Sequence, residues 1–354
     1  WVSRTPSIRS TDALRFTTIF GTTHEGKSMR LRLLTIFLTA ILLSIAASGS
    51  VLAADTLPTA IPDQAFWRMI TDFSEPGGSF DFEMYMSNEV TFQTILPDLL
   101  RIVPTGGVYL GVGPEQNFTY ISALRPRIAF IIDIRRENML EMLMYKALFE
   151  MSPNRIEFVG HLFSRSLGSS VDPNAPIERI FSALSRKGDP RFFSQNIQNI
   201  KDRLQKTHGF PLTASDLRTI DYIYTAFFRG GPEASLTTFG TSYRALMAYT
   251  DGQGRNRNFI ADEANFQFVR EMHRKNLIIP VVGDFAGPKA VRAVARYLKD
   301  HQAAVNAFYT SNVEEYISTP RSVWTAYCGN LAALAVAPSG TFIRFGRAGR
   351  RSPR

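Results

Sequence analysis

Short apolar runs recur along the chain, separated by longer stretches with helical spacing. Runs of this length that are apolar on both faces are typical of strands buried on both sides of a sheet. The runs are Val108–Gly111, Ile128–Asp133, 277–284, 305–309 and 341–343. Because these strands alternate with helices, we predict an α/β fold built on a doubly wound, mainly parallel sheet.

Amphipathic stretches predict the helices that cover this sheet. They are 63–70, a segment from about 87 with a kink at 97, 136–149, one after 287, and 324–335. In 136–149 the apolar face is rich in methionine, which more often packs in a core than binds a ligand. We therefore expect this helix to bury one face and expose the other.

The middle of the chain, about 152–270, contains no convincing buried strand. Helices are expected at 175–185, 189–207 and 213–228, preceded by one that Ser152 caps with Pro153 in its first turn. A segment of about a hundred residues with this much helical pattern is too long and too structured to be a linker. We predict a large helical insertion in the α/β domain.

The N-terminal region has the pattern of an export signal. Residues 29–53 combine a short basic start, an apolar run at 33–47 and a small-residue cleavage site ending at Ala53. The run is short for a membrane span, so we expect a periplasmic or secreted protein without a stable span after cleavage, with an uncleaved anchor as the alternative. Residues 1–28 precede the plausible start and form a non-coding or disordered extension, which leaves 54–345 as the folded domain.

Charge is concentrated in the tails. The formal net charge is +9, yet residues 55–340 carry no net charge, and 346–354 form a basic tail that we expect to be disordered. A nucleic-acid-binding protein gathers positive charge on its folded face. Nucleic acid is therefore not an expected partner.

Metal and disulfide chemistry have little support. The single cysteine, Cys328, forms no internal disulfide, and we expect it to be buried on a helix. No histidine pair has metal-ligand spacing. We predict no metal site.

The first strand leads into a turn with two glycines, Gly111 and Gly113, and Asp133 closes the next strand twenty residues later. Glycine lets the backbone turn sharply beside a ligand, and a carboxylate accepts hydrogen bonds from ribose hydroxyls. Gln116 replaces the third glycine of a dinucleotide fingerprint. The pattern favours an adenosyl-type pocket over a NAD site.

Two later strands also end in polar residues. Asp284 with Phe285 follows one strand, and Ser311 with Asn312 follows the next. Carboxyl ends of parallel strands meet at one edge of the sheet, where ligands bind. We expect these residues to rim one cleft with Asp133.

This order of strand ends resembles class I S-adenosylmethionine-dependent methyltransferases. The resemblance assigns cofactor binding to Gly111, Gly113, Glu115, Asp133, Asp284 and Phe285, and the substrate side to Asn88, Glu89, Ser311, Asn312 and Glu315. It implies S-adenosylmethionine as a possible cofactor. Over about 60–345 the chain also resembles an uncharacterised bacterial family of exported proteins with this fold and no established reaction; the segments that carry this resemblance are 74–78, 87–89, 281–287 and 309–314.

The chain departs from the methyltransferase pattern. Tyr109 stands where these enzymes have an acid, and Glu115 replaces a glycine. S-adenosylmethionine is also made in the cytoplasm, away from an exported protein. We therefore expect a cleft that binds a small polar molecule or a cell-envelope component with the chemistry lost or diverged. S-adenosylmethionine-dependent methyl transfer is the alternative.

Each candidate residue also has a structural interpretation. The two glycines can simply form a tight turn, and Asp133 can pair with Arg135, Arg136 or a helix N-terminus. Asp284 and Asn312 can cap the helices that follow them. Glu89 can stabilise the N-terminus of a helix through the helix dipole without facing the cleft.

Overall fold

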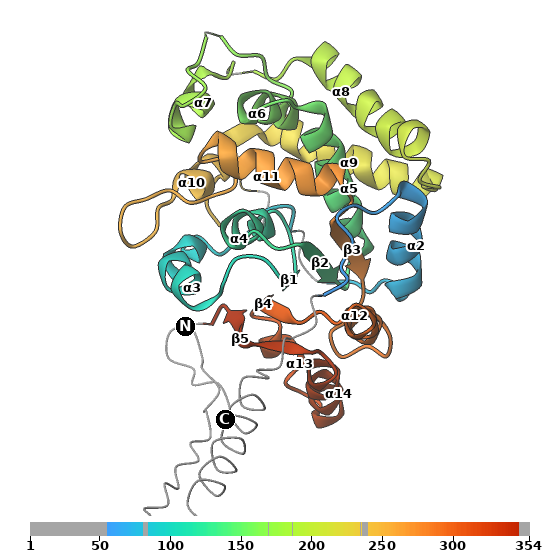
Figure 1. Cartoon of the computed structure of the whole chain (residues 1–354). Helices are drawn as coiled ribbons and strands as arrows, with labels where there is room; N and C mark the ends of the chain where they lie inside the picture. Colours follow the sequence, from blue (N-terminus) through green and yellow to red (C-terminus); the bar gives the residue numbers. More distant parts are fainter. Residues whose placement is uncertain are drawn as a thin grey trace, which may run out of the picture. The chain divides into compact units, whose positions relative to one another are not determined.

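The fold is built on one sheet of five parallel strands (Figure 1). The computed structural model describes residues 55–80, 84–168, 170–185, 187–233, 235 and 240–346. The strands are β1 (Val108–Gly111), β2 (Ile128–Asp133), β3 (Ile278–Val282), β4 (Val305–Ser311) and β5 (Val336–Arg344). Their order, β3-β2-β1-β4-β5, confirms the predicted doubly wound α/β fold.

The chain changes direction across the sheet at β1. Strands β2 and β3 follow on one side of β1, whereas β4 and β5 follow on the other. The register between β1 and β4 shifts at Val108, where the amide of Val108 donates to the side-chain oxygen of Asn306 over 3.1 Å. The boundary between β1 and β4 is thus the topological switch point, where α/β folds place their ligands.

Helices cover both faces of the sheet (Figure 1). The first face is covered by α5 (Arg136–Met151), which packs on β2 and β3, and by α4 (Gln116–Leu124), which packs against α11 (Glu263–Arg274). The other face is covered by α12 (Ala290–Asp300), which contacts β2, α2 (Asp63–Phe73) and α14 (Arg321–Ala332).

The expectation that 136–149 forms an amphipathic helix is wrong in one respect. The helix exists as α5, but twelve of its residues are buried, including Glu141 and Lys146. One side packs on β2 and β3, and the other packs under the helical insertion, on α6 (Arg155–Phe163) and α9 (Ala214–Gly230). A helix that is packed on all sides has no solvent-exposed face, so the division into an apolar and a polar face does not apply to it.

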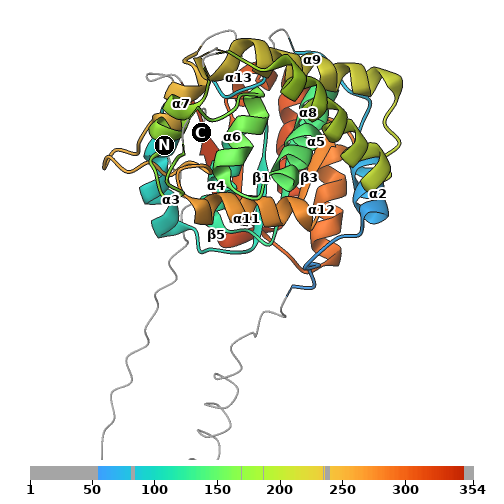
Figure 2. The ribbon, with the colours of Figure 1, turned by 90° about the horizontal axis from the view of Figure 1, so that it is seen from above.

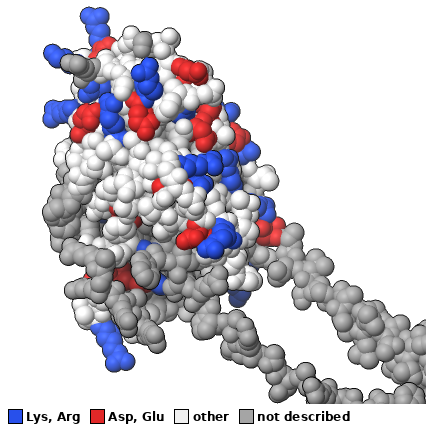
Figure 3. Space-filling model, turned by 90° about the vertical axis from the view of Figure 1, so that its left-hand side faces the viewer, with Lys and Arg blue, Asp and Glu red and all other residues white. Residues whose placement is uncertain are grey.

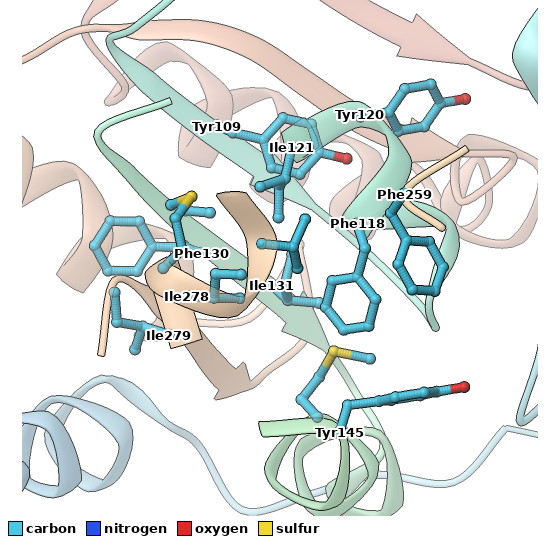
Figure 4. Packing of buried hydrophobic residues seen from close by; sticks show 14 of the residues in the cluster. Tyr109, Phe118, Tyr120, Ile121, Phe130, Ile131, Tyr145, Phe259, Ile278 and Ile279 are labelled. Carbon is cyan, nitrogen blue, oxygen red and sulfur yellow. The ribbon is translucent and has the colours of Figure 1, made fainter. Parts of the chain in front are cut away.

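Aromatic rings fill the layer between the sheet and the insertion. Phe118 of α4 lies edge-on to Tyr145 of α5 and to Phe259, at centroid distances of 5.3 and 5.4 Å. Figure 4 shows these three rings gathered beside Ile131 of β2. Such edge-to-face contacts join α4, α5 and the insertion into one core.

The insertion is helical, as predicted. Besides α6, α9 and α11 it contains α7 (Ile177–Ala183), α8 (Pro190–Asp202), a π-helical turn η2 (Arg203–Thr207), a 3-10 turn η3 (Gly231–Glu233) and α10 (Tyr243–Ala248). Its described residues contain no strand, only an isolated bridge between Leu167 and Leu184. Figure 2 shows α6, α8 and α9 over α5, which each of them contacts.

Helix caps explain several boundaries. Asp189 caps α8, and Thr213 with Asp216 forms a capping box on α9. The cap predicted at Ser152 is wrong, because Asn154 accepts the amide of Glu157 at the start of α6. The side chain of Ser152 instead donates to the Leu148 carbonyl over 2.7 Å.

The helix expected from about Ser87 begins later. A 3-10 turn, η1 (Phe92–Ile95), leads into α3 (Leu96–Ile102), with Pro97 in its first turn. Proline fits there because the first helical amides have no partner within the helix. Residues 87–89 are therefore loop.

The expected burial of Cys328 is also wrong. Cys328 lies on a helix, α14, as predicted, but its side chain is exposed. Among the residues of α14 only Tyr327 and Asn330 are buried. This helix covers the edge of the domain with one narrow face, which leaves the cysteine on the other.

The predicted signal peptide at 29–53, the extension at 1–28 and the basic tail after Gly346 lie outside the described residues. Within the described part of the chain, every helix is too short or too polar to cross a lipid bilayer. On the face seen in Figure 3, acidic and basic side chains are interspersed.

Candidate functional site

A cavity of about 480 Å³ opens at the carboxyl edge of the sheet. Every strand contributes: residues 112–114 follow β1, Asp133 ends β2, residues 283–285 follow β3, Ser311 ends β4, and Phe345 follows β5. Small-ligand sites in proteins are typically about 300–1,000 Å³. The cavity lies where the switch point predicts a ligand.

Most of the predicted site residues meet in this cavity. Its lining includes Gly113, Asp133, Asp284, Phe285, Asn88, Ser311, Asn312 and Glu315. Gly111, Glu89 and Glu115 are outside the lining and lie behind its wall. The ligand-binding roles of the lining residues remain predictions.

The glycine turn is fixed by a residue that the sequence did not single out, Asn117. Its side-chain nitrogen donates to the carbonyls of Val112, Gly113 and Pro114 over 2.9, 3.2 and 2.8 Å. A Cβ on Gly111 would lie 1.9 Å from the Asn117 side-chain oxygen, and Gly113 has φ +79°. Gly111 therefore makes room for this asparagine, and Gly113 adopts the left-handed backbone.

Asp133 is paired with Arg135. Its carboxylate accepts the backbone amide and Nε of Arg135 on one oxygen, at 2.9 and 3.0 Å, and Nη2 on the other, at 2.9 Å. Burial alone lowers the pKa of Arg135, but the Asp133 carboxylate outweighs it and the pKa is raised. Three of the roughly four acceptor positions of a carboxylate are thus occupied.

Glu89 anchors the end of β4 from behind the cavity. It accepts the hydroxyl of Ser311, which has φ +52°, and Nε2 of Gln116 over 2.9 Å. Burial raises the pKa of Glu89, although these hydrogen bonds act in the opposite direction. Glu89 therefore acts on the cavity through Ser311, which lines it.

Glu115 immediately precedes α4, at its N-cap position, and is fully buried. Its Oε1 accepts the amide of Ser87 over 3.2 Å, and its Oε2 has no hydrogen-bond partner among the described residues. Burial raises the pKa of Glu115 to about 8, against the effect of the Ser87 bond. With its pKa raised, Glu115 adds little negative charge behind the cavity wall at neutral pH.

Asp284 and Asn312 each make a local turn. Asp284 accepts the amide of Ala286 over 2.8 Å, while Asn312 donates to Glu315 over 3.4 Å. Both nevertheless line the cavity. The expectation that they cap the following helices is wrong, because Lys289 is the N-cap of α12 and Val313 is the N-cap of α13 (Glu314–Ile317).

Aromatic side chains form much of the remaining wall. Phe80 and Tyr316 meet edge-on at 5.1 Å, and Phe285 packs against Phe308 at 5.4 Å. Phe80 reaches the cavity because its segment follows the sheet edge, where the amide of Gly78 donates to Ile134 over 2.8 Å. The turn-rich composition of 74–80 was the available signal, but it did not indicate a position at the site.

The charged side chains of the lining are few. Among the described lining residues, Arg135 is the only basic one, and the acids are Asp133, Asp284 and Glu315. No group of three or more potential metal ligands occurs within the described residues. With Arg135 engaged by Asp133, the cavity carries two acids without a basic partner in its wall.

A family model matches the chain. The model of a family described as a domain of unknown function, DUF7790, matches residues 84–348, which include all the strands and most of the cavity lining. No curated protein matches the chain.

Proposed function

The chain belongs to the DUF7790 family, and from the chemistry of its cavity we propose that it binds a small, positively charged ligand of adenosyl type. S-adenosylmethionine is the first candidate, and the cavity at the carboxyl edge is the observation that carries the proposal. We further propose that the protein is exported and that its methyltransferase chemistry is lost or diverged.

The sign of the ligand's charge follows from the lining. Asp284 and Glu315 face the cavity, whereas the guanidinium of Arg135 is engaged by Asp133. A phosphate would need free basic groups, as in other phosphate sites. A sulfonium or ammonium group instead gains from the two carboxylates and from nearby aromatic faces.

The shape of the ligand follows from the rings. Four aromatic side chains lie within the lining, and two of them, Phe80 and Tyr316, meet edge-on; the other two are Phe285 and Tyr309. A flat heterocycle such as adenine packs favourably against aromatic side chains. A positively charged nucleoside can pack its base against the aromatic rings and place its charge near the carboxylates.

Divergence is supported by two positions. Asp133, which the resemblance assigns to the ribose, has three acceptor positions occupied by Arg135, so it cannot accept both hydroxyls of a diol without displacing that arginine. Tyr109 is buried and donates to Asn117 over 2.8 Å, so no carboxylate faces the cavity from this position.

Calorimetry tests the proposal. We expect heat of binding with S-adenosylmethionine and a weaker response with S-adenosylhomocysteine, which lacks the sulfonium charge. Replacing both free acids, Asp284→Asn with Glu315→Gln, should weaken S-adenosylmethionine binding about three- to tenfold. The matched control, Glu178→Gln with Asp300→Asn, removes two exposed charges outside the cavity and should bind like the wild type.

Two results would overturn the proposal. The first is no heat with millimolar S-adenosylmethionine. The second is binding that falls equally in the cavity variant and the surface control, because that would place the charge effect outside this site.

Methyl transfer remains the second candidate, since Ser311 and Glu315 line the same cavity as Gly113. Incubation of the protein with methyl-labelled S-adenosylmethionine and a cell-envelope extract tests it. Label transferred by the wild type and lost in Asp284→Asn with Glu315→Gln would establish an enzyme. Ligand binding without transfer supports a binding protein.

A further inference from the structure

A second hollow lies where α5 meets the helical insertion and α11, and it is separate from the cavity at the sheet edge. Its volume is about 320 Å³, and it is lined by Glu150, Arg203, His208, Arg270 and Arg274. The residues come from α5, from the π-helical turn and the residue after it, and from α11. None of them lines the first cavity.

The single carboxylate of this hollow already has partners. Glu150 accepts Nζ of Lys146 over 2.7 Å and faces Nε2 of His208 over 2.7 Å. Burial acts to raise the pKa of Glu150, but the hydrogen bond with His208 and the nearby Lys146 lower it to about 2. Glu150 is therefore charged and balanced by Lys146, and it offers little compensation to the arginines.

The three arginines keep most of their donors free for another group. Arg203 reaches Glu150 only at 3.5 Å, and Arg274 reaches Glu271 only at 3.6 Å. Arg270 donates to two uncharged oxygens, the carbonyl of Phe149 at 3.1 Å and the side chain of Gln267 at 3.3 Å. The three arginines outnumber the one carboxylate of the lining, so they repel one another unless a further anion lies between them.

The backbone beside the hollow is unusual. α8 continues into a π-helical turn, in which the amide of His208 donates to the carbonyl of Arg203 over 3.0 Å. This hydrogen bond spans five residues and joins Arg203 and His208, which both line the hollow. Such turns are rare in proteins and occur often at functional sites.

We propose that this hollow binds a phosphate group. Guanidinium groups bind phosphate oxygens through paired N–H donors, and the surplus of positive charge favours a dianion over a single carboxylate. The phosphate is either free inorganic phosphate or the headgroup of an anionic phospholipid, which present the same oxygens to the arginines.

Titration with inorganic phosphate at constant ionic strength tests the site, with binding followed by calorimetry. We expect Arg270→Gln with Arg274→Gln to weaken phosphate binding at least about tenfold, because each charge-assisted hydrogen bond between an arginine and phosphate contributes strongly to the binding free energy. The control, Arg296→Gln with Lys299→Gln, removes the same charge from exposed positions of α12 and should leave binding unchanged.

Arg270 also holds the end of α5, so its replacement could disturb the fold. Arg274→Gln alone avoids this problem, because the Arg274 side chain is 55% exposed and its ion pair is with Glu271 on the same helix. This variant should weaken phosphate binding about three- to tenfold. Equal binding by wild type and Arg274→Gln, or no binding by the wild type, would overturn the proposal.

Sedimentation with vesicles separates the two sources. Capture by phosphatidylglycerol vesicles but not by phosphatidylcholine vesicles, lost in Arg270→Gln with Arg274→Gln, would identify a lipid headgroup. Binding of inorganic phosphate without vesicle capture would identify free phosphate. Vesicle capture that survives the arginine replacements, with no phosphate binding, would place any anion contact elsewhere and contradict the proposal.

Discussion

Replacing Arg155 by methionine is expected to lower the free energy of unfolding by about 3–5 kcal/mol. The side chain is 1% exposed, and its guanidinium donates to four backbone carbonyls. The acceptors belong to Pro173, Ala175, Ile260 and Ala261. One buried cation thus joins the loop before α7 to the segment before α11, and methionine leaves all four carbonyls without this donor.

Urea denaturation followed by circular dichroism measures this loss, with Arg179→Met as the control. Arg179 is an exposed arginine of α7 and should change stability by less than about 0.5 kcal/mol. Hydrogen exchange should also accelerate in α7 of the Arg155 variant before the strands open. A loss below about 1 kcal/mol would mean that water replaces the guanidinium without penalty.

Replacing Glu115 by glutamine is expected to remove part of the pH dependence of stability. The pKa of Glu115 rises from 4.5 to about 8 on burial, so the folded protein holds this proton over a range in which the unfolded chain releases it. The contribution of Glu115 is therefore fully present below pH 4.5 and is lost as pH rises to about 8. At higher pH the loss reaches about 3–5 kcal/mol.

Glutamine is a close substitute for the protonated acid. Its oxygen can accept the amide of Ser87, and its NH₂ replaces an oxygen that has no described partner. The variant should match the wild type near pH 4 and exceed its stability above pH 8. Glu178→Gln, at an exposed position, should follow the wild type at both values. A constant difference between wild type and Glu115→Gln across this range would show that Glu115 does not titrate on burial.

The first three strands were predictable because each is buried on both sides. In β1, β2 and β3 every residue is buried, so the apolar run in the sequence is the strand itself. β5 is different: half-buried and exposed residues alternate at its start, and the predicted strand covered only its last part. β3 is also an edge strand, but α2 and α5 pack on it and keep it buried, so the weak apolar signal of β5 reflects its exposed faces and not its place at the edge.

The site was predictable as far as it depends on where strands end. Asp133, Asp284 and Ser311 meet because parallel strands bring their carboxyl ends to one edge. The contribution of Phe80 was not predictable, since it depends on how a loop lies along that edge. The direction of Glu115 was also not predictable, because a side chain at the start of a helix can face inward or toward the ligand.

The three carbonyls held by Asn117 bear on how quickly a ligand can be captured. Because this loop after β1 is already ordered, it loses little conformational entropy when a ligand binds. Association should then proceed in one kinetic step, with a rate proportional to ligand concentration and no slow rearrangement behind it.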